Sequence, residues 1–186
     1  MTTRWAPAKK DTLRELAAEI VHNYGRGRVV VAVDGDTAGA PGVGPFADDL
    51  AEAIRESGQT AFRASLRAFS RRPASAPRDA EPELDESVLR RVLVEPFLLG
   101  GSTGWVEAAF DAEADRALEP TWVTGPADAV LVVDGTDMSR PGLSGIWHYR
   151  VWVSVGDART AGRATASAVV GNDDPEHPRR RFDDAC

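Results

Sequence analysis

Lysine is almost absent from this chain of 186 residues, occurring only at Lys9 and Lys10. Any site after residue 10 that depends on an ammonium group is therefore excluded, including one in which a lysine reaches bound phosphates. Cys186 is the only cysteine, which excludes an intrachain disulfide and a cysteine-rich metal site. No apolar run approaches the roughly 20 residues that a membrane helix needs, so we expect no membrane partner.

The overall composition is that of a soluble globular protein, with 42% hydrophobic and 27% charged residues. The net charge of -7 and the absence of a long basic stripe argue against nucleic acid as a partner. The N-terminal segment is amphipathic and does not resemble a signal peptide, so a cytoplasmic location is expected. The length suits a single domain over 1–186. The oligomeric state is left open.

Hydrophobic periodicity predicts an alternation of helices and strands. Apolar residues at helical spacing predict helices at 11–24, 46–56, 85–94 and 158–170. Short apolar runs predict buried strands at 28–33 and 129–133, and further strands are predicted at 60–66 and 149–155. The pattern predicts an α/β fold, with a parallel sheet covered by helices on both faces. Residues 1–27 form its N-terminal helical region, and the polar segment 171–186 is expected to be a loop or a small lid.

Four charged residues follow the predicted strands at the positions where a parallel sheet binds ligands. Because ligands bind at the carboxyl ends of such strands, we expect these side chains to lie near one rim of the sheet: Asp34, Arg67, Asp134 and Asp157.

A glycine-rich segment, 34–45, joins the first strand to the helix at 46–56. This is the layout of a phosphate cradle, in which backbone N–H groups and a helix N-terminus face an anion. The sequence does not match G-x-x-x-x-G-K-[ST], the pattern of a working loop of this kind. A tight connection without a ligand is the plain alternative. A dinucleotide-binding loop does not fit, since Gly42 lies too far beyond the strand.

The segments on each side of this loop, VAVDG and FADDLAEAI, resemble those of uridine-kinase-like P-loop proteins of actinobacteria. In that resemblance Val43 stands in place of the lysine, and Gly44 and Pro45 replace two hydroxyl residues. The loop is also longer than the family's, and Asp36 adds a negative charge. The arginine-for-lysine and alanine-rich composition is typical of a GC-rich genome.

The resemblance extends over about residues 28–182, and it assigns roles to individual positions. RASLRAFSRRP resembles the acceptor motif, with Arg67 in place of the acidic general base. LVEPFLLGG and AVLVVDGTDMSRPGL also match, which puts Asp134 at the end of the metal-side strand. Arg163 matches one lid arginine, and GNDDPEHPRRRF resembles the lid side. The resemblance implies a P-loop-kinase-like fold with a small lid near the C-terminal end.

These losses predict a degenerate kinase-like protein without a functional ATP site, without a cofactor and without a metal. Phosphoryl transfer depends on positioning and on neutralising phosphate charge, and arginine cannot accept a proton near neutral pH. We expect the former acceptor cleft to bind a small organic molecule and to promote an ATP-independent step. A catalytically inactive binding or regulatory protein and an atypical nucleoside kinase remain alternatives.

The candidate residues fall into two groups. The expected catalytic residues are Asp34, Asp134 and Arg67, and the expected substrate-binding residues are Arg63, Trp105, Glu107, Asp111 and Trp122. Two carboxylates in a partly closed pocket can have separated pKa values and act as acid and base. The plainer alternatives are that both carboxylates cap loops and that Arg67 pairs with one of them.

Overall fold

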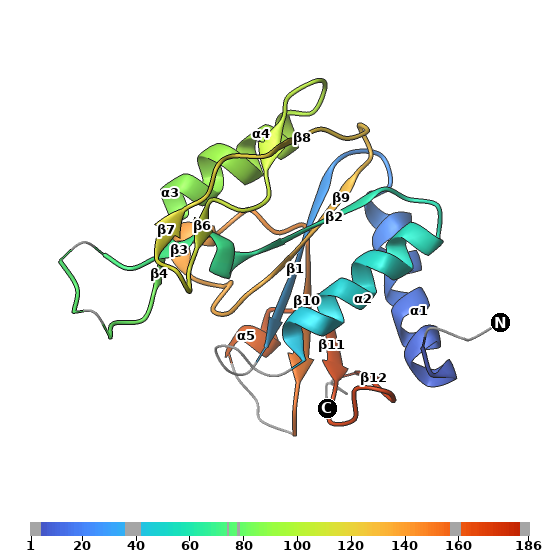
Figure 1. Ribbon diagram of the computed structural model, residues 1–186. Coiled ribbons are helices and arrows are strands. Elements are labelled where there is room, and N and C mark those ends of the chain that lie inside the picture. The colour runs from blue at the N-terminus through green and yellow to red at the C-terminus, as the bar shows by residue number, and fades with distance from the viewer. Residues whose placement is uncertain (1–4, 36–41, 74, 78, 157–160, 183–186) are drawn as a thin grey trace.

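The computed structural model describes residues 5–35, 42–73, 75–77, 79–156 and 161–182. Figure 1 shows a central sheet with helices on both sides. The helices are α1 (Pro7–Tyr24), α2 (Val43–Glu56), α3 (Glu86–Leu89), α4 (Glu95–Leu99) and α5 (Ala161–Ala164), with helical turns η1 (Leu66–Phe69), η2 (Arg90–Val94) and η3 (Pro141–Leu143). The long strands are β1 (Val29–Gly35), β2 (Ala61–Ser65), β9 (Val130–Asp134), β10 (Tyr149–Ser154), β11 (Ala168–Gly171) and β12 (Arg179–Arg181).

These six strands form one sheet in the order β12-β11-β10-β1-β9-β2. All neighbouring pairs are parallel except β11 and β12. β1 lies in the interior of the sheet and every one of its residues is buried, as its run of β-branched side chains predicts. The predicted α/β fold with a parallel sheet is confirmed.

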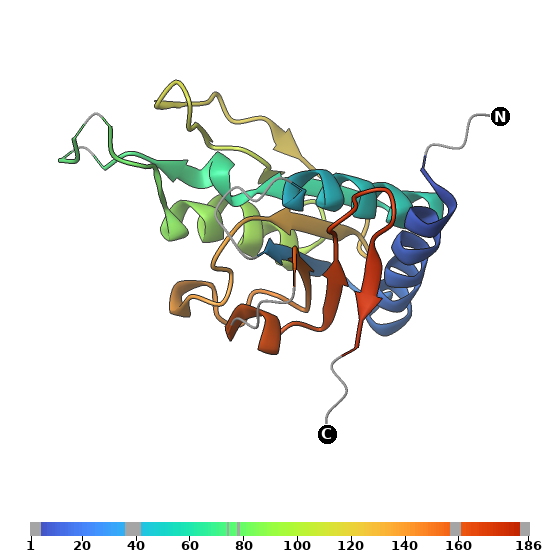
Figure 2. The same ribbon diagram turned by 90° about the horizontal axis from the view of Figure 1, so that it is seen from below.

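The two faces of the sheet carry separate cores. Val29, Val31 and Val33 of β1 pack toward α1 and α2. Val30 and Ala32 point the other way, because successive side chains of a strand alternate, and they pack with the α3, η2 and α4 region. Figure 2 shows α2 on one side of the sheet and α5 on the other. Each side chain at a strand end therefore belongs to one face, which decides which groups can meet.

Three short two-stranded ribbons complete the strands outside the sheet. β3 (Ser70–Arg71) pairs with β4 (Glu83–Leu84), β5 (Trp105–Val106) with β8 (Trp122–Val123), and β6 (Phe110–Asp111) with β7 (Arg116–Ala117). The helical segment predicted at 85–94 continues to Leu99, although Pro96 was expected to end it. Pro96 follows directly on η2, a π-helical turn, and such a local widening of the helix accompanies a break in its hydrogen-bond pattern. Among the described residues, no helix is both long and apolar enough to cross a membrane.

The helix predicted at 158–170 is wrong. Within the described part of that segment, residues 161–170, the helix is limited to Ala161–Ala164, and Ala168–Gly171 is a fully buried strand that pairs in parallel with β10. Two adjacent β-branched residues, Val169 and Val170, suit a strand inside a sheet better than a helix. Residues 157–160 lie outside the described ranges, and so does Asp157.

The polar segment 171–186 is not a lid in the part that the structure describes. Arg179–Arg181 forms β12, which adds an antiparallel strand to β11. It is attached to α1, because Arg180 is bonded to Glu19 and the Thr12 hydroxyl donates to the Pro178 carbonyl at 2.9 Å. The repeated arginines conceal a strand because their stems can cover apolar surface while their charged ends pair with α1.

Candidate functional site

Three parallel strands end side by side at the carboxyl edge of the sheet. β1 ends at Asp34 and Gly35, β9 at Asp134, and β2 at Ser65. α2 begins at Val43, close to the same edge. Residues 36–41, with Asp36, lie outside the described ranges, so the expectation that this loop is part of no functional ATP site stays a prediction.

Asp134 and its partners lie on the face of the sheet that α2 covers. The side chain of Asp134 is in register with Ser65 and Val33. Its Oδ1 accepts a hydrogen bond from Arg63 Nη2 at 2.8 Å, and its Oδ2 accepts one from the Ser65 hydroxyl at 3.2 Å. Arg63 also donates from Nε to Asp48 on α2 at 2.8 Å. The predicted residues Arg63 and Asp134 thus meet, as an ion pair.

The first turn of α2 approaches this pair through a glycine. A Cβ atom at Gly44 would lie 3.8 Å from Asp134 Oδ2. Gly44 is the position at which the resemblance places a hydroxyl residue, so the backbone keeps the approach and the hydroxyl is missing. The cation that contacts the carboxylate of Asp134 is the guanidinium of Arg63.

Asp34 lies on the opposite face of the sheet. It is in register with Trp152, whereas Asp134 is in register with Val33, and this offset of one residue places the two carboxylates on different sides. Asp34 Oδ1 accepts from the Gly35 N–H at 2.9 Å and Oδ2 from the Met138 N–H at 3.1 Å. The expected carboxylate pair is not formed.

The carboxyl group of Asp34 is almost fully buried, and burial raises its pKa. The two backbone hydrogen bonds and the charge of Arg150, whose Nη2 is 3.6 Å from Oδ2, oppose this rise. A buried carboxyl group with a raised pKa can give or take a proton closer to neutral pH than an exposed one.

The pH dependence of stability should reveal this buried carboxyl group. Since the folded state binds the Asp34 proton more tightly than the unfolded chain, its contribution to stability is fully present below the unfolded pKa and is lost as the pH rises through the folded pKa. We therefore expect the Asp34→Asn variant to gain stability relative to wild type as the pH rises from about 4 toward 7, measured by urea unfolding at each pH.

Asp111→Asn provides a control of opposite sign. Backbone hydrogen bonds from Ala114 and Glu113 lower the pKa of Asp111. Its contribution is therefore present above the unfolded pKa and is lost as the pH falls through the folded pKa. For each variant, the free energy of unfolding relative to wild type is plotted against pH. If this difference changes in the same direction for both variants, the assignment of the raised pKa to Asp34 is contradicted.

Arg67 does not join either carboxylate at the strand ends. Its side chain is 65% exposed, and its guanidinium lies 3.7 Å from the carboxylate of Glu113. The plainer alternative, in which Arg67 pairs with Asp34 or Asp134, is not what the structure shows. The reason is the helical turn η1, which follows β2 directly and carries Arg67 on its exposed side.

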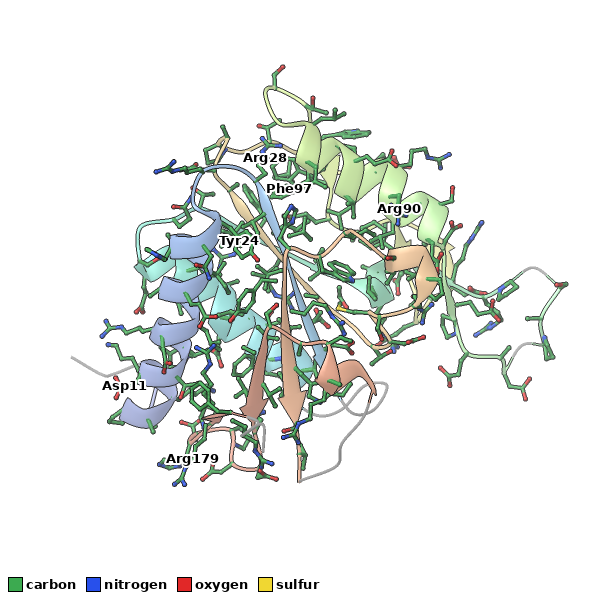
Figure 3. All side chains as sticks on the ribbon, turned by 180° about the vertical axis from the view of Figure 1, so that it is seen from behind. Asp11, Tyr24, Arg28, Arg90, Phe97 and Arg179 are labelled. Carbon is green, nitrogen blue, oxygen red and sulfur yellow. The ribbon has the colours of Figure 1, made fainter. Side chains whose placement is uncertain are left out.

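Trp105 was expected to bind substrate, and the structure places it fully buried in the core. Its ring makes edge contacts with Phe62 and Phe97, with centroids 4.9 and 5.1 Å apart, and Arg28 lies over it at 4.9 Å. Figure 3 shows Arg28 beside Phe97. Arg28 precedes β1, so Trp105 lies toward the amino ends of the strands, away from the carboxyl edge.

The remaining candidates do not converge on one point. Trp122 is paired opposite Val106 in the β5–β8 ribbon and is 62% exposed. Glu107 is partly buried, and burial raises its pKa while Arg55 lowers it. Asp111 accepts hydrogen bonds from the N–H groups of Glu113 and Ala114 at 3.2 and 3.0 Å, so it caps its own hairpin.

A hollow of about 470 Å³ lies beside the segment that follows β2. It is lined by Arg71, Arg72, Pro73, Glu83, Leu84, Asp85 and Glu86. Its volume suits a small organic molecule. Its first three lining residues belong to the acceptor motif that the sequence resembles. No group of three or more metal-ligating residues is close enough together within the described ranges to hold a metal ion.

Sequence reasoning missed Arg150, which is the charged neighbour of Asp34. An arginine inside the otherwise apolar run of β10 could have indicated it, because a buried charge needs a partner. Trp152, two residues further along β10, was not among the candidates either. Both residues lie on the Asp34 face, since Ala32 is in register with Arg150 and Asp34 with Trp152.

The arrangement of the sheet is shared with solved kinase structures. A possible uridine kinase from Bacillus stearothermophilus superposes with a TM-score of 0.64 at 18% sequence identity, over 81% of this chain and 82% of that one. A candidate fructose transport system kinase from a Silicibacter species superposes with a TM-score of 0.60 at 21% identity, over 81% and 76% of the two chains. This chain has the fold of uridine-kinase-like P-loop kinases. No protein-family profile and no curated protein sequence matches it.

Likeness at this level of identity establishes the fold and leaves the activity to be argued from the site. In this P-loop-kinase fold, the position of Gly44 is the beginning of the helix that follows β1. The chemistry at that position is therefore the deciding feature.

Proposed function

We propose that this P-loop-kinase-like protein does not transfer phosphoryl groups and instead binds and transforms a small organic molecule at the carboxyl edge of the sheet, without ATP. The observation that carries the proposal is the contact between the first turn of α2 and Asp134. Position 44 approaches that carboxylate with a glycine, and Arg63 already neutralises it at 2.8 Å.

A magnesium ion would meet poor conditions at this point. Mg²⁺ is bound through oxygen ligands such as hydroxyl, carboxylate and phosphate groups. Gly44 supplies no hydroxyl, and the Arg63 guanidinium repels a second cation at the same carboxylate. With no lysine after Lys10, several losses combine, and each 1.4 kcal/mol of lost transition-state stabilisation slows a reaction about tenfold.

The chemistry that remains does not require a nucleotide. Asp34, at the carboxyl edge, is a buried carboxyl group whose pKa is raised by burial; the residues that line the hollow beside β3 and β4 do not include it. An enzyme that holds a substrate in the right orientation against a group that exchanges a proton can lower the activation free energy substantially.

Calorimetry with Mg²⁺-ATP tests the proposal. We expect no measurable binding at millimolar nucleotide, because the site lacks both the hydroxyl and the lysine that hold the nucleotide and its metal. A dissociation constant in the micromolar range, with phosphoryl transfer to uridine or fructose, would instead establish a kinase of the sort named for the two solved structures.

The positive half of the proposal is tested with candidate substrates taken from the products of neighbouring genes. Asp34→Asn should abolish product formation while ligand binding persists. Arg14→Met, which changes a largely exposed arginine 3.9 Å from Glu56, should behave as wild type. Unchanged turnover in Asp34→Asn would end the acid–base assignment.

A catalytically inactive binding protein is the second candidate, and one observation favours it. Leu98, Leu99 and Trp122 are 40%, 76% and 62% exposed, and α4 and β8 lie next to each other in Figure 1. Exposed apolar groups that cluster can mark a partner surface. In that case Leu99→Asp should abolish partner binding, and Asp34→Asn should change nothing.

A further inference from the structure

Arg150 and Trp152 project from β10 on the same face of the sheet as Asp34. They are two residues apart on one strand, and the register pairs Trp152 directly with Asp34. The short helix α5 covers them, because a Cβ atom at Gly162 would overlap the Trp152 ring. Figure 2 shows α5 close to β10 on this side of the sheet.

Several buried donors of these two side chains have no acceptor. Arg150 uses Nη1 to donate to the Thr165 hydroxyl at 2.6 Å. Its Nε and Nη2 are buried without a hydrogen-bond partner, and so is Trp152 Nε1. The contact from Nη2 to Asp34 Oδ2 is 3.6 Å, too long for a hydrogen bond. Buried donors without partners are rare in proteins, and each requires an explanation.

Asp34 does not satisfy them, because its Oδ2 lies 3.6 Å from Nη2 and none of these donors has a hydrogen-bond partner; the hydrogen bonds that its oxygens accept come from the Gly35 and Met138 N–H groups. The free donors Nε and Nη2 belong to the same edge of the guanidinium, where their N–H bonds run side by side. That edge matches the two oxygens of a carboxylate in a bidentate pair. Trp152 Nε1 is a third buried donor, two residues further along the same strand.

The surrounding charge favours a ligand with a single negative charge. Asp34 lies beside the free donors, and Asp137 is close enough for its charge to raise the pKa of Asp34. A doubly charged phosphate would meet two carboxylates, whereas a carboxylate brings one charge for the guanidinium edge to neutralise. Gly162 of α5 packs against the Trp152 ring, so α5 forms the wall of this position opposite β10.

We propose that the space between β10 and α5 beside Asp34 binds the carboxylate group of a small organic acid, held by Arg150 Nε and Nη2 and by Trp152 Nε1. This assignment rests on the proposed function, since it names the chemical class of the ligand that the same edge of the sheet receives. Asp34 is then positioned beside the bound acid.

Nuclear magnetic resonance of the indole N–H groups tests the site with sodium acetate as the probe. The signal of Trp152, assigned by its loss in Trp152→Phe, should shift in a saturable way as acetate is added. Sodium chloride at equal ionic strength should leave it unchanged. Trp147 is the internal control, because its Nε1 already donates to the Met138 carbonyl at 2.8 Å, and its signal should not move.

Two variants distinguish the contribution of the paired N–H donors of Arg150 from that of its positive charge. Arg150→Lys keeps the charge and loses the side-by-side donors, so acetate should bind about tenfold more weakly. The matched control is Arg90→Lys, because Arg90 binds the Gly142 carbonyl at 2.7 Å on another part of the chain, and it should bind acetate as wild type does. The Trp152→Phe variant should also bind acetate more weakly than wild type, as measured by calorimetry. This second test does not depend on the folding of the Arg150 variant.

A missing saturable shift, equal affinity in wild type and Arg150→Lys, or tighter binding of sodium phosphate than of acetate would each overturn the assignment. The same samples titrated with Mg²⁺-ATP keep the two proposals apart. Nucleotide binding would end the proposed function, while the acetate titration would still decide whether this carboxylate site exists.

Discussion

Replacing Trp105 with alanine is expected to lower the free energy of unfolding by about 3–5 kcal/mol. The side chain is fully buried, and its ring packs edge-on against Phe62 and Phe97. A Cβ atom at Gly125 would lie within 3.0 Å of the Trp105 ring, so the indole is enclosed from that side too. Removing it leaves a cavity that these neighbours can fill only in part.

Urea unfolding of Trp105→Ala and Trp122→Ala measures this effect against a matched control. Trp122 is 62% exposed and belongs to the same β5–β8 ribbon. Its loss should change the free energy of unfolding by about 0.5 kcal/mol or less. If Trp105→Ala is as stable as wild type and has lost ligand binding, then Trp105 is a binding residue after all and its burial has been misjudged.

The four long parallel strands that β-branched runs mark could be predicted from the sequence. The run 129–133 favours a strand buried on both faces, because it is short, rich in β-branched residues and bounded by turn residues. The actual strand, Val130–Asp134, differs by one residue at each end. The edge of the sheet was hidden, since β12 is a run of three arginines and its place beside β11 depends on contacts with α1.

The sequence predicts which edge of the sheet carries the two carboxylates, but it does not predict the face of the sheet on which each one lies. The sequence places Asp34 and Asp134 at the ends of neighbouring strands, as the structure does. Which side each carboxylate takes depends on register, and register is fixed by long-range packing that no single strand contains. Because of this offset of one residue, the carboxylates of Asp34 and Asp134 lie on opposite faces of the sheet.

The same alternation divides the carboxyl edge into two chemical environments. On the α2 face, Asp134 is neutralised by Arg63 and bonded to Ser65. On the other face, Arg150 and Trp152 keep buried donors without acceptors beside Asp34. The first arrangement leaves little for a metal to bind, and the second leaves donors for an anion. Function at this edge is therefore expected on the face opposite α2.

Replacing Arg28 with methionine is expected to lower the free energy of unfolding by about 3–5 kcal/mol, because hydrogen bonds from a charged donor contribute about 1.5–3 kcal/mol each and are not additive. Arg28 is buried and donates to four backbone carbonyls, those of Phe97, Gly101, Gly125 and Pro126. Three of these bonds, to Phe97, Gly125 and Pro126, measure 2.7, 2.6 and 3.1 Å.

The guanidinium of Arg28 joins the end of α4 to the segment before β9, and it stacks over Phe97 and Trp105 at 5.3 and 4.9 Å. Methionine fills similar volume, so the loss of stability should come from the carbonyls left without a donor.

Urea unfolding of Arg28→Met, Arg28→Lys and Arg14→Met separates the causes. Arg28→Lys keeps the charge without the fork and should fall between wild type and Arg28→Met. Arg14→Met removes an exposed arginine and should change stability by about 0.5 kcal/mol or less. If Arg28→Lys matches wild type, the charge over the two rings holds this end of the sheet and the four carbonyl bonds contribute little.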